Sequence, residues 1–105
     1  MKLRFSLSAL LYMRAEQAYI ARFNRLAAKA AVAQIRKAAA MLADHPGAGA
    51  ELFLVPGVRR YVSAPYRIDY VTTGDTIIIV AIRHGRQREV EIEGDDEGFE
   101  EPGAS

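Results

Sequence analysis

Arginine side chains gather near a histidine in the second half of the chain. Arg83, His84, Arg86 and Arg88 follow an apolar segment at residues 76–82, TIIIVAI. Cutting RNA through its 2′-hydroxyl needs a group that removes a proton, a group that protonates the leaving oxygen, and cations that hold the phosphate. The arginines would supply the cations, and the imidazole of His84 is the candidate for proton transfer. The same charges would also suit the docking of an acidic protein.

The candidate binding set consists of six arginines on predicted strands or just beyond them. They are Arg59, Arg60, Arg67, Arg83, Arg86 and Arg88. Arginine on exposed strand faces also protects sheet edges and keeps a sheet protein soluble, so this simpler role stays open. On strands that pair with one another, some of the six must converge. We therefore expect a basic patch that binds a target or an inhibitory partner.

The remaining titratable and aromatic candidates have simpler structural roles. A histidine that precedes a glycine at a strand end, as His84 does, is more often a turn residue than a catalyst. His45 follows a predicted helix, where a partial positive charge suits the helix dipole. Tyr61, Tyr66 and Tyr70 are expected to pack on a sheet face. The chain has no cysteine, and we expect no metal site and no cofactor.

The charge of the chain is strongly divided along its length. All 14 lysines and arginines lie between Lys2 and Arg88, where five acids oppose them and leave a net charge of +9. The last 17 residues hold the other eight acids and no base. We expect residues 1–93 to form one domain and residues 94–105 to be a disordered acidic tail.

No part of the sequence predicts a membrane span. No apolar run approaches the roughly 20 residues needed to cross a bilayer. The opening MKLRFSLSALLYM is similar to a short secretion signal, but Arg14 and Glu16 follow at once without a cleavage site. We interpret it as a strand that runs into a helix, and we expect a cytoplasmic protein.

Two helices are predicted after an opening strand. Alternation over residues 2–7 predicts the strand. Ser8 is the predicted N-cap of a helix from Ala9 to about Asn24. Glu16 and Gln17 interrupt the apolar seam of this helix. The apolar spacing of residues 28–42 predicts a second helix, which DHPG at residues 44–47 ends. Arg25, Lys29 and Arg36 share another face of that helix. A break near Asn24 would make a hairpin, although a nearly continuous helix is also compatible with the sequence.

Three strands follow the helices. VRRYV, YRIDYV and TIIIVAI are predicted strands, with Arg67 and Asp69 opposite in face to the tyrosines, and RQREVEI is a candidate for one more. The short links between the three force antiparallel pairing. The order β-α-α-β-β-β predicts an α+β fold, with a helical hairpin packed on an antiparallel sheet.

These segments together resemble the RelE/ParE toxin superfamily, the toxic partners of bacterial type II toxin–antitoxin pairs. The resemblance covers roughly residues 3–88. It rests on the opening strand with SALL, on YIAR at 19–22, and on MLADHPGAG, GVRRYVSAPYRIDYV and IIIVAIRHGRQ. The resemblance implies the α+β fold of that superfamily, and a role in plasmid maintenance or stress response.

The resemblance implies one of two activities. RelE-like members cut messenger RNA on the ribosome, and that role would fall here to Arg67, Arg86 and His84. ParE-like members poison DNA gyrase without a covalent reaction. Gln87 stands where the nucleases usually carry an arginine, and the tyrosine that follows in them is missing. We therefore favour a ParE-like, non-enzymatic gyrase inhibitor; the nuclease and an inactive binding relative are the alternatives.

A partner protein is also implied by the resemblance. Toxins of this kind are silenced by an antitoxin, here ParD-like, whose acidic C-terminal segment folds onto the toxin; such binding needs a groove with apolar pockets and oppositely charged rims. Sequence-specific binding of nucleic acid is not expected. The acidic residues Glu89–Glu101 are either a solubilising tail or an internal competitor for the arginines.

Overall fold

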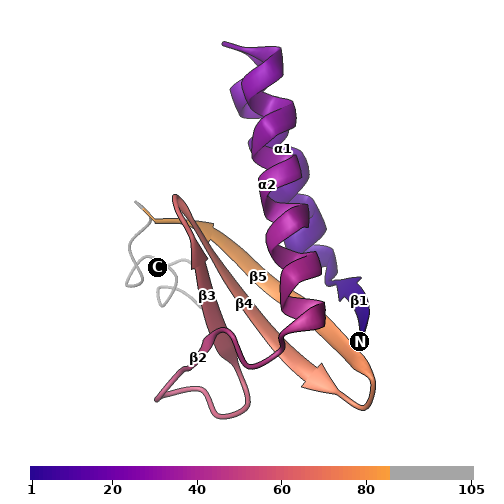
Figure 1. The fold of residues 1–105 in the computed structure, drawn as a ribbon. Helices are drawn as coiled ribbons and strands as arrows, with labels where there is room; N and C mark the ends of the chain where they lie inside the picture. The colour runs from indigo at the N-terminus through magenta and orange to yellow at the C-terminus, as the bar shows by residue number, and fades with distance from the viewer. Residues whose placement is uncertain (86–105) are drawn as a thin grey trace.

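Residues 1–85 are described by the computed structural model, in which two helices cover one face of a five-stranded sheet (Figure 1). The helices are packed side by side as a hairpin, and their far end projects beyond the sheet. The elements are β1 (Lys2–Phe5), α1 (Leu7–Ala21), α2 (Arg25–Asp44), β2 (Ala50–Glu51), β3 (Arg59–Ser63), β4 (Tyr66–Thr73) and β5 (Thr76–His84).

The strands lie in the order β1-β5-β4-β3-β2. The predicted α+β class is confirmed, and so is the antiparallel pairing of β3, β4 and β5. β1 pairs with β5 in parallel, so the sheet is mostly and not wholly antiparallel. The two-residue strand β2 was not predicted, since a pair of residues carries no alternation; pairing with Arg59 and Arg60 holds it in the sheet. The candidate strand RQREVEI and the predicted tail at 94–105 lie outside the described residues.

The first helix begins earlier than the sequence pattern predicts. Ser6, not Ser8, is the N-cap: its backbone is extended and its hydroxyl accepts a hydrogen bond from the amide of Ala9 at 3.1 Å. The same hydroxyl donates to the carbonyl oxygen of Val80 at 3.0 Å. Ser6 therefore joins the start of α1 to β5, a contact between residues far apart in the sequence.

The break between the helices is a true turn. Asn24 has an extended backbone and accepts a hydrogen bond from the Ala27 amide at 2.9 Å, which caps α2. The hairpin alternative is therefore the right one. Ala28, Ala31 and Ile35 belong to the buried stripe of α2, as their spacing predicts. Small alanine side chains on this stripe let the two helices and the sheet approach closely.

A β-bulge sets the register of the two longest strands. Thr73 to Tyr70 pair in step with Thr76 to Ile79, but Asp69 lies opposite Ala81, so β5 carries Val80 as an extra residue. The bulge allows Ile82, three positions after Ile79, to enter the core as well. Beyond Val80 the side chains of β5 change face. Ile82 lies on the core side and Arg83 on the other side, whereas strict alternation from Ile77 would give the reverse.

Replacement of Ser6 tests the capping assignment. Ser6→Ala removes the cap of α1 and the bond to Val80, so it should lower the free energy of unfolding by about 1–2 kcal/mol. Ser8→Ala is the matched control, because this exposed side chain lies inside the first turn, and it should change stability by less than about 0.5 kcal/mol. Urea unfolding followed by circular dichroism measures both. Equal losses in the two variants would contradict Ser6 as the cap.

Candidate functional site

Three arginines share the face of the sheet that is turned away from the helices, which we call the outer face. On β4, Tyr66 and Ile68 belong to the core, so Arg67 between them faces outward. Arg67 lies directly opposite Arg83 on β5. Arg60 lies on the same face, opposite Asp69. We call Arg60, Arg67 and Arg83 the arginine face.

Arg59 does not belong to the arginine face. It lies opposite the buried Tyr70, on the helix side of the sheet. One terminal nitrogen donates to the carbonyl oxygen of Gly49 at 2.6 Å, and the other lies 3.7 Å from the Glu51 carboxylate. This arginine therefore secures the connection between α2 and β2. The predicted partners Arg86 and Arg88 lie outside the described residues.

Within the arginine face, Arg60 has a fixed carboxylate partner. Arg60 forms two hydrogen bonds with Asp69, from Nε to Oδ1 at 2.7 Å and from Nη2 to Oδ2 at 3.0 Å. Asp69 is only 7% exposed, and this two-pronged contact is the strongest form of the arginine–carboxylate pair. Arg67 and Arg83 are like charges placed directly opposite one another.

His84 is separated from Arg67 by the sheet. His84 pairs with Tyr66, and their rings meet edge to face with centroids 5.8 Å apart, on the helix side. Arg67 is on the outer face, where its neighbours include Val62 and the Asp69 carboxylate that binds Arg60. The candidate acid or base and the candidate phosphate ligand of the nuclease alternative therefore do not converge. Its third member, Arg86, lies outside the described residues.

A part-buried carboxylate–tyrosine contact explains an anomaly of the first helix. Glu16 interrupts the predicted apolar seam, and it accepts a hydrogen bond from the Tyr66 hydroxyl at 2.7 Å. Burial raises the pKa of Tyr66 well above its ordinary value, and the bond to Glu16 raises it further. Burial, followed by the charge of Glu16, raises the pKa of Tyr12 to about 12. Tyr12 also packs edge to face on Tyr66, so this cluster ties α1 to the sheet.

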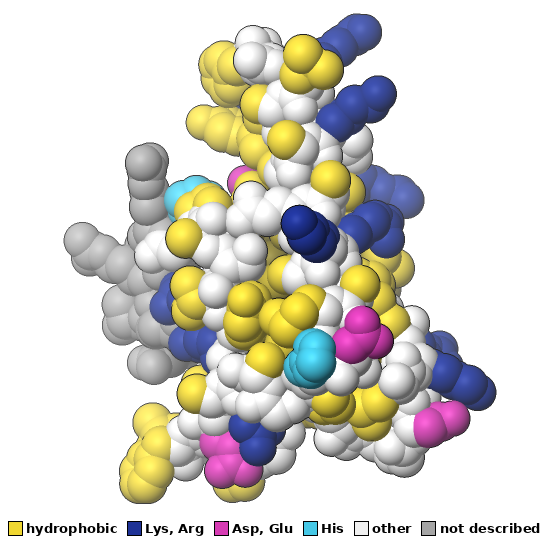
Figure 2. All heavy atoms as spheres, in the orientation of Figure 1, with side chains coloured by type: hydrophobic (Ala, Val, Ile, Leu, Met, Phe, Trp, Pro, Cys, Tyr) yellow, Lys and Arg dark blue, Asp and Glu magenta, His cyan; other side chains and the backbone are white. Residues whose placement is uncertain are grey.

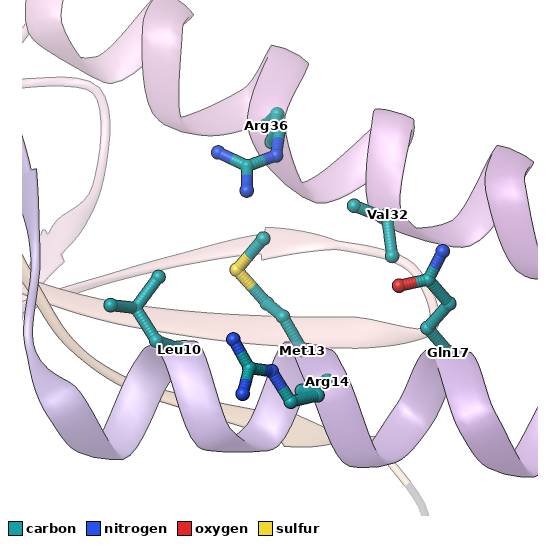
Figure 3. A pocket seen from close by; sticks show the side chains of 6 residues that line it. All are labelled: Leu10, Met13, Arg14, Gln17, Val32 and Arg36. Carbon is teal, nitrogen blue, oxygen red and sulfur yellow. The ribbon is translucent and has the colours of Figure 1, made fainter.

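A second cationic surface lies along the seam between the helices. Two hollows of about 180 and 360 Å³ lie along this seam and share Gln17 as a lining residue, and we call the two together the helix groove. In Figure 3, Met13 of α1 and Arg36 of α2 meet over the first hollow, with Leu10 and Gln17 at its two ends. The groove is lined by Leu10, Met13, Arg14, Gln17, Val32 and Arg36, and by Ala21, Arg25, Leu26, Ala28 and Lys29.

The rim of the helix groove is positively charged. Arg14, Arg25, Lys29 and Arg36 surround its apolar floor, and none of them forms an ion pair with a carboxylate of residues 1–85. The two helices contain no acids other than Glu16 and Asp44. Figure 2 shows the lysines and arginines gathered along one flank of the hairpin, with apolar side chains on the other. An apolar floor with a basic rim suits an amphipathic acidic helix.

The sequence pattern predicted some of the residues that line this groove. It placed Arg25, Lys29 and Arg36 on one face of the second helix, but it gave no sign that Arg14 and Leu10 would complete the rim and floor from the first. Helix-to-helix packing brings these side chains together, and the turn at Asn24 makes it possible. The exposed Leu26 was the available signal, since it lies outside the buried stripe of its helix.

Two further kinds of site were sought among residues 1–85. No three side chains of histidine, aspartate or glutamate gather there in a way that would hold a metal ion. Neither described helix has the length and apolar character required to cross a membrane.

Comparison with known proteins gives a consistent family assignment. Residues 3–89 match the family model of the ParE toxin of the type II toxin–antitoxin system parDE. A solved structure of the chromosomal ParDE system from P. aeruginosa contains a chain 26% identical in sequence, with a TM-score of 0.68, covering 80% of this chain and 95% of that one. The isolated E. coli RelE toxin shares the fold at 18% identity and a TM-score of 0.56, covering 88% and 92%. No curated protein gave a significant match.

The hydroxyls of Tyr12 and Tyr66 predict a loss of stability in alkali. Since the folded-state pKa values of Tyr12 and Tyr66 lie above the ordinary 10.0, the unfolded chain ionises first, and their contribution to stability is complete below pH 10. The free energy of unfolding should then fall between pH 10 and about 12. Tyr66→Phe should make this fall smaller, while lowering stability at pH 7 by about 1 kcal/mol. Urea unfolding at pH 8 and pH 11 measures both effects.

Glu16→Gln is the matched control for this prediction. The amide can still accept the bond from Tyr66, but the charge is gone. Because burial is the larger cause of both shifts, most of the alkaline loss should remain. Identical pH dependence in the wild type and Tyr66→Phe would contradict a role for the Tyr66 hydroxyl.

Proposed function

We propose, since the chain belongs to the ParE toxin family of type II toxin–antitoxin systems, that it inhibits DNA gyrase by non-covalent binding in the cytoplasm. Its cognate antitoxin is ParD-like and neutralises it by direct binding. The ParDE system of P. aeruginosa, whose toxin-like chain covers most of this one, supports the antitoxin partnership.

The observation that carries the proposal is the separation of Arg67 from His84. Cleavage of RNA requires cations and a proton-transfer group around one phosphate. Arg67 lies on the outer face, whereas His84 packs on Tyr66 on the helix side. The nearby carboxylate of Asp69 is held by two hydrogen bonds from Arg60. This arrangement supports a binding surface rather than a reaction centre, and it does not favour the nuclease alternative.

The helix groove is the proposed seat of the antitoxin. Its floor offers hollows for apolar side chains, and the four cations on its rim would form ion pairs with carboxylates of the antitoxin. An acidic helix that folds onto the toxin would place its apolar stripe on Met13 and Val32 and its carboxylates beside the rim. Burial of the apolar stripe would supply most of the affinity, and the charges would speed the encounter and orient the helix.

Inhibition of gyrase can be tested directly. The purified toxin should block supercoiling by purified gyrase, and its induction in cells should cause DNA breaks and filamentation while messenger RNA stays intact. Expression of the neighbouring antitoxin gene should restore growth. Message cleavage with intact chromosomes would contradict the proposal, and Arg67→Ala would then be the variant with which to test a nuclease. Lack of toxicity would support an inactive relative instead.

Charge reversal in the helix groove tests the antitoxin site. The double variant Arg25→Glu, Lys29→Glu should weaken binding of the antitoxin by about ten-fold or more, because two attractive rim contacts become repulsive. Both side chains are exposed, so the fold should survive. Lys37→Glu is the matched control, since this cation is on the same helix but outside the groove. Isothermal titration of toxin with antitoxin measures the affinities, and equal values for the two variants would exclude the groove.

A further inference from the structure

The connection between β2 and β3 holds large apolar side chains in water. Phe53 is 95% exposed, Leu54 84% and Val55 48%, and Phe53 has the largest exposed fraction of the large apolar side chains in residues 1–85. Figure 1 shows this connection projecting from the sheet at the end of the molecule opposite to the turn between the helices, and Figure 2 shows apolar side chains at that corner. We call residues 52–58 the apolar loop. It belongs neither to the core nor to the helix groove.

Two consecutive turns fix the backbone of the apolar loop. The Leu52 amide donates to the carbonyl oxygen of Val58 at 2.9 Å and closes the loop. Within it, the Val55 amide donates to the carbonyl oxygen of Leu52 at 3.4 Å, and the Val58 amide donates to that of Val55 at 3.2 Å. Pro56 and Gly57 are the central residues of the second turn, where Gly57 has the positive φ of 84° that a type II turn needs. The tip is therefore held outward and cannot fold onto the sheet without breaking these bonds.

Phe53 and Leu54 are unusual residues for their position. They are the two central residues of the first turn, where glycine, proline, asparagine, aspartate and serine are the common choices. With Val55 they expose a few hundred Å² of apolar surface, the size at which a patch on a monomer marks an interaction site. Because the turns already fix the tip, its binding would cost little conformational entropy.

We propose that the tip of the apolar loop, formed by Phe53, Leu54 and Val55, inserts into an apolar cleft of the target protein. This inference rests on the proposed function, because it takes gyrase as the target. The loop would then be a contact with the target that is separate from the antitoxin site in the helix groove.

A hollow beside the tip adds a charged contact. It has a volume of about 420 Å³ and is lined by Glu51, Leu52, Phe53, Pro56 and Gly57. The Glu51 carboxylate lies 3.7 Å from a terminal nitrogen of Arg59, which is longer than a hydrogen bond, and its side chain is 76% exposed. Its oxygens can therefore accept a bond from a cation of the partner. The aliphatic part of a lysine or arginine would lie against Phe53 while its charged end reaches Glu51.

This charge favours the target over the antitoxin as the occupant. Glu51 is the only charged residue in the segment 46–58. The loop thus has no cation for the carboxylates of an acidic antitoxin, and Glu51 would repel them, as it would repel the phosphates of a nucleic acid. A protein that acts on DNA carries lysines and arginines where it meets the phosphate backbone. An apolar cleft flanked by a basic side chain is therefore the matching chemistry.

The size of the tip disfavours a second copy of this chain. Two tips pressed against each other would bury less than the roughly 1,000 Å² expected of a specific protein interface. A convex tip that enters a concave cleft removes more surface from water, because the walls of the cleft are buried as well.

The double variant Phe53→Ser, Leu54→Ser is the deciding test. Serine is common in β-turns and both side chains are exposed, so the backbone of the loop should be kept while its apolar tip is lost. We expect the variant to need at least ten-fold more protein than the wild type to inhibit supercoiling by purified gyrase. Its affinity for the antitoxin, measured by isothermal titration, should change by less than three-fold, which also shows that the fold is intact.

Leu7→Gln, Leu11→Gln is the matched control. These two leucines are 70% and 54% exposed on α1 and do not line the helix groove. The control also replaces two exposed apolar side chains by polar ones, and we expect it to inhibit gyrase as the wild type does. An equal loss in both double variants would mean that exposed apolar surface in general matters, and this would overturn the assignment of the loop.

The charged contact is tested with Glu51→Gln. We expect its affinity for purified gyrase, measured by surface plasmon resonance, to be about three-fold lower than that of the wild type. The difference should shrink as the salt concentration rises, because exposed charges are screened. Asp75→Asn is the control, since Asp75 is also exposed and lies 3.8 Å from its partner Lys2, in the turn between β4 and β5. Equal affinities for Glu51→Gln and Asp75→Asn would contradict the basic side chain beside the cleft.

Four other results for Phe53→Ser, Leu54→Ser would overturn the inference. Inhibition equal to that of the wild type would remove the loop from the target contact, and a ten-fold loss of antitoxin affinity would give the loop to the antitoxin. Loss of a dimer that the wild type forms in analytical ultracentrifugation would make a second copy the occupant. Loss of binding to vesicles of phosphatidylcholine and phosphatidylglycerol would make a lipid surface the occupant.

Failure of the proposed function gives a different result from failure of this inference. If the wild type does not inhibit gyrase at all, the proposed function fails, and the inference fails with it. If the wild type inhibits gyrase and the double variant of the loop does so equally well, only the inference fails.

Discussion

The antiparallel pairing of β4 with β5 is the interaction on which the rest of the structure depends. It is the longest pairing of the sheet. The inward side chains of these two strands form much of the core under the helices, and their outward side chains include Arg67 and Arg83. Its register includes one bulge at Val80, whose carbonyl oxygen receives a hydrogen bond from the Ser6 hydroxyl. The cap of α1 and the irregularity of β5 therefore support each other. A register without the bulge would place Ile82 opposite Arg67, and the arginine pair of the outer face would not form.

The two-layer arrangement lets a small chain present two basic surfaces without bringing them together. The alanine-rich helix α2 and the helix α1 pack on an isoleucine-rich sheet, which leaves the long cationic side chains at the periphery. Repulsion between the surfaces is weakened by distance and by solvent ions, since exposed charges are screened over about 8 Å at physiological ionic strength.

Local patterns in the sequence predicted much of the fold. Apolar spacing identified α2, alternation identified β4, and the short links implied antiparallel strands, because each of these signals depends only on neighbouring residues. Two assignments failed where distant contacts decide. Ser6 caps α1 in place of Ser8, since it alone reaches Val80 as well, and β2 exists only through its pairing with β3. Glu16 looked like a flaw in the first helix until its bond to Tyr66, fifty residues away, gave it a partner.

The sequence by itself determined the two helices and the strands β1, β3, β4 and β5, their order, the resemblance to a toxin family and the excess of arginine in the second half of the chain. It also determined that Arg67 and Asp69 share a face of β4, because side chains alternate along a strand. Only the tertiary structure decided which arginines meet. The bulge in β5 aligns Arg83 with Arg67 and turns His84 to the other side, while Arg59 is drawn to the carbonyl oxygen of Gly49. The physical reason is that register and helix packing join residues far apart in the chain, and no local pattern of charge or hydrophobicity encodes a shift of one residue.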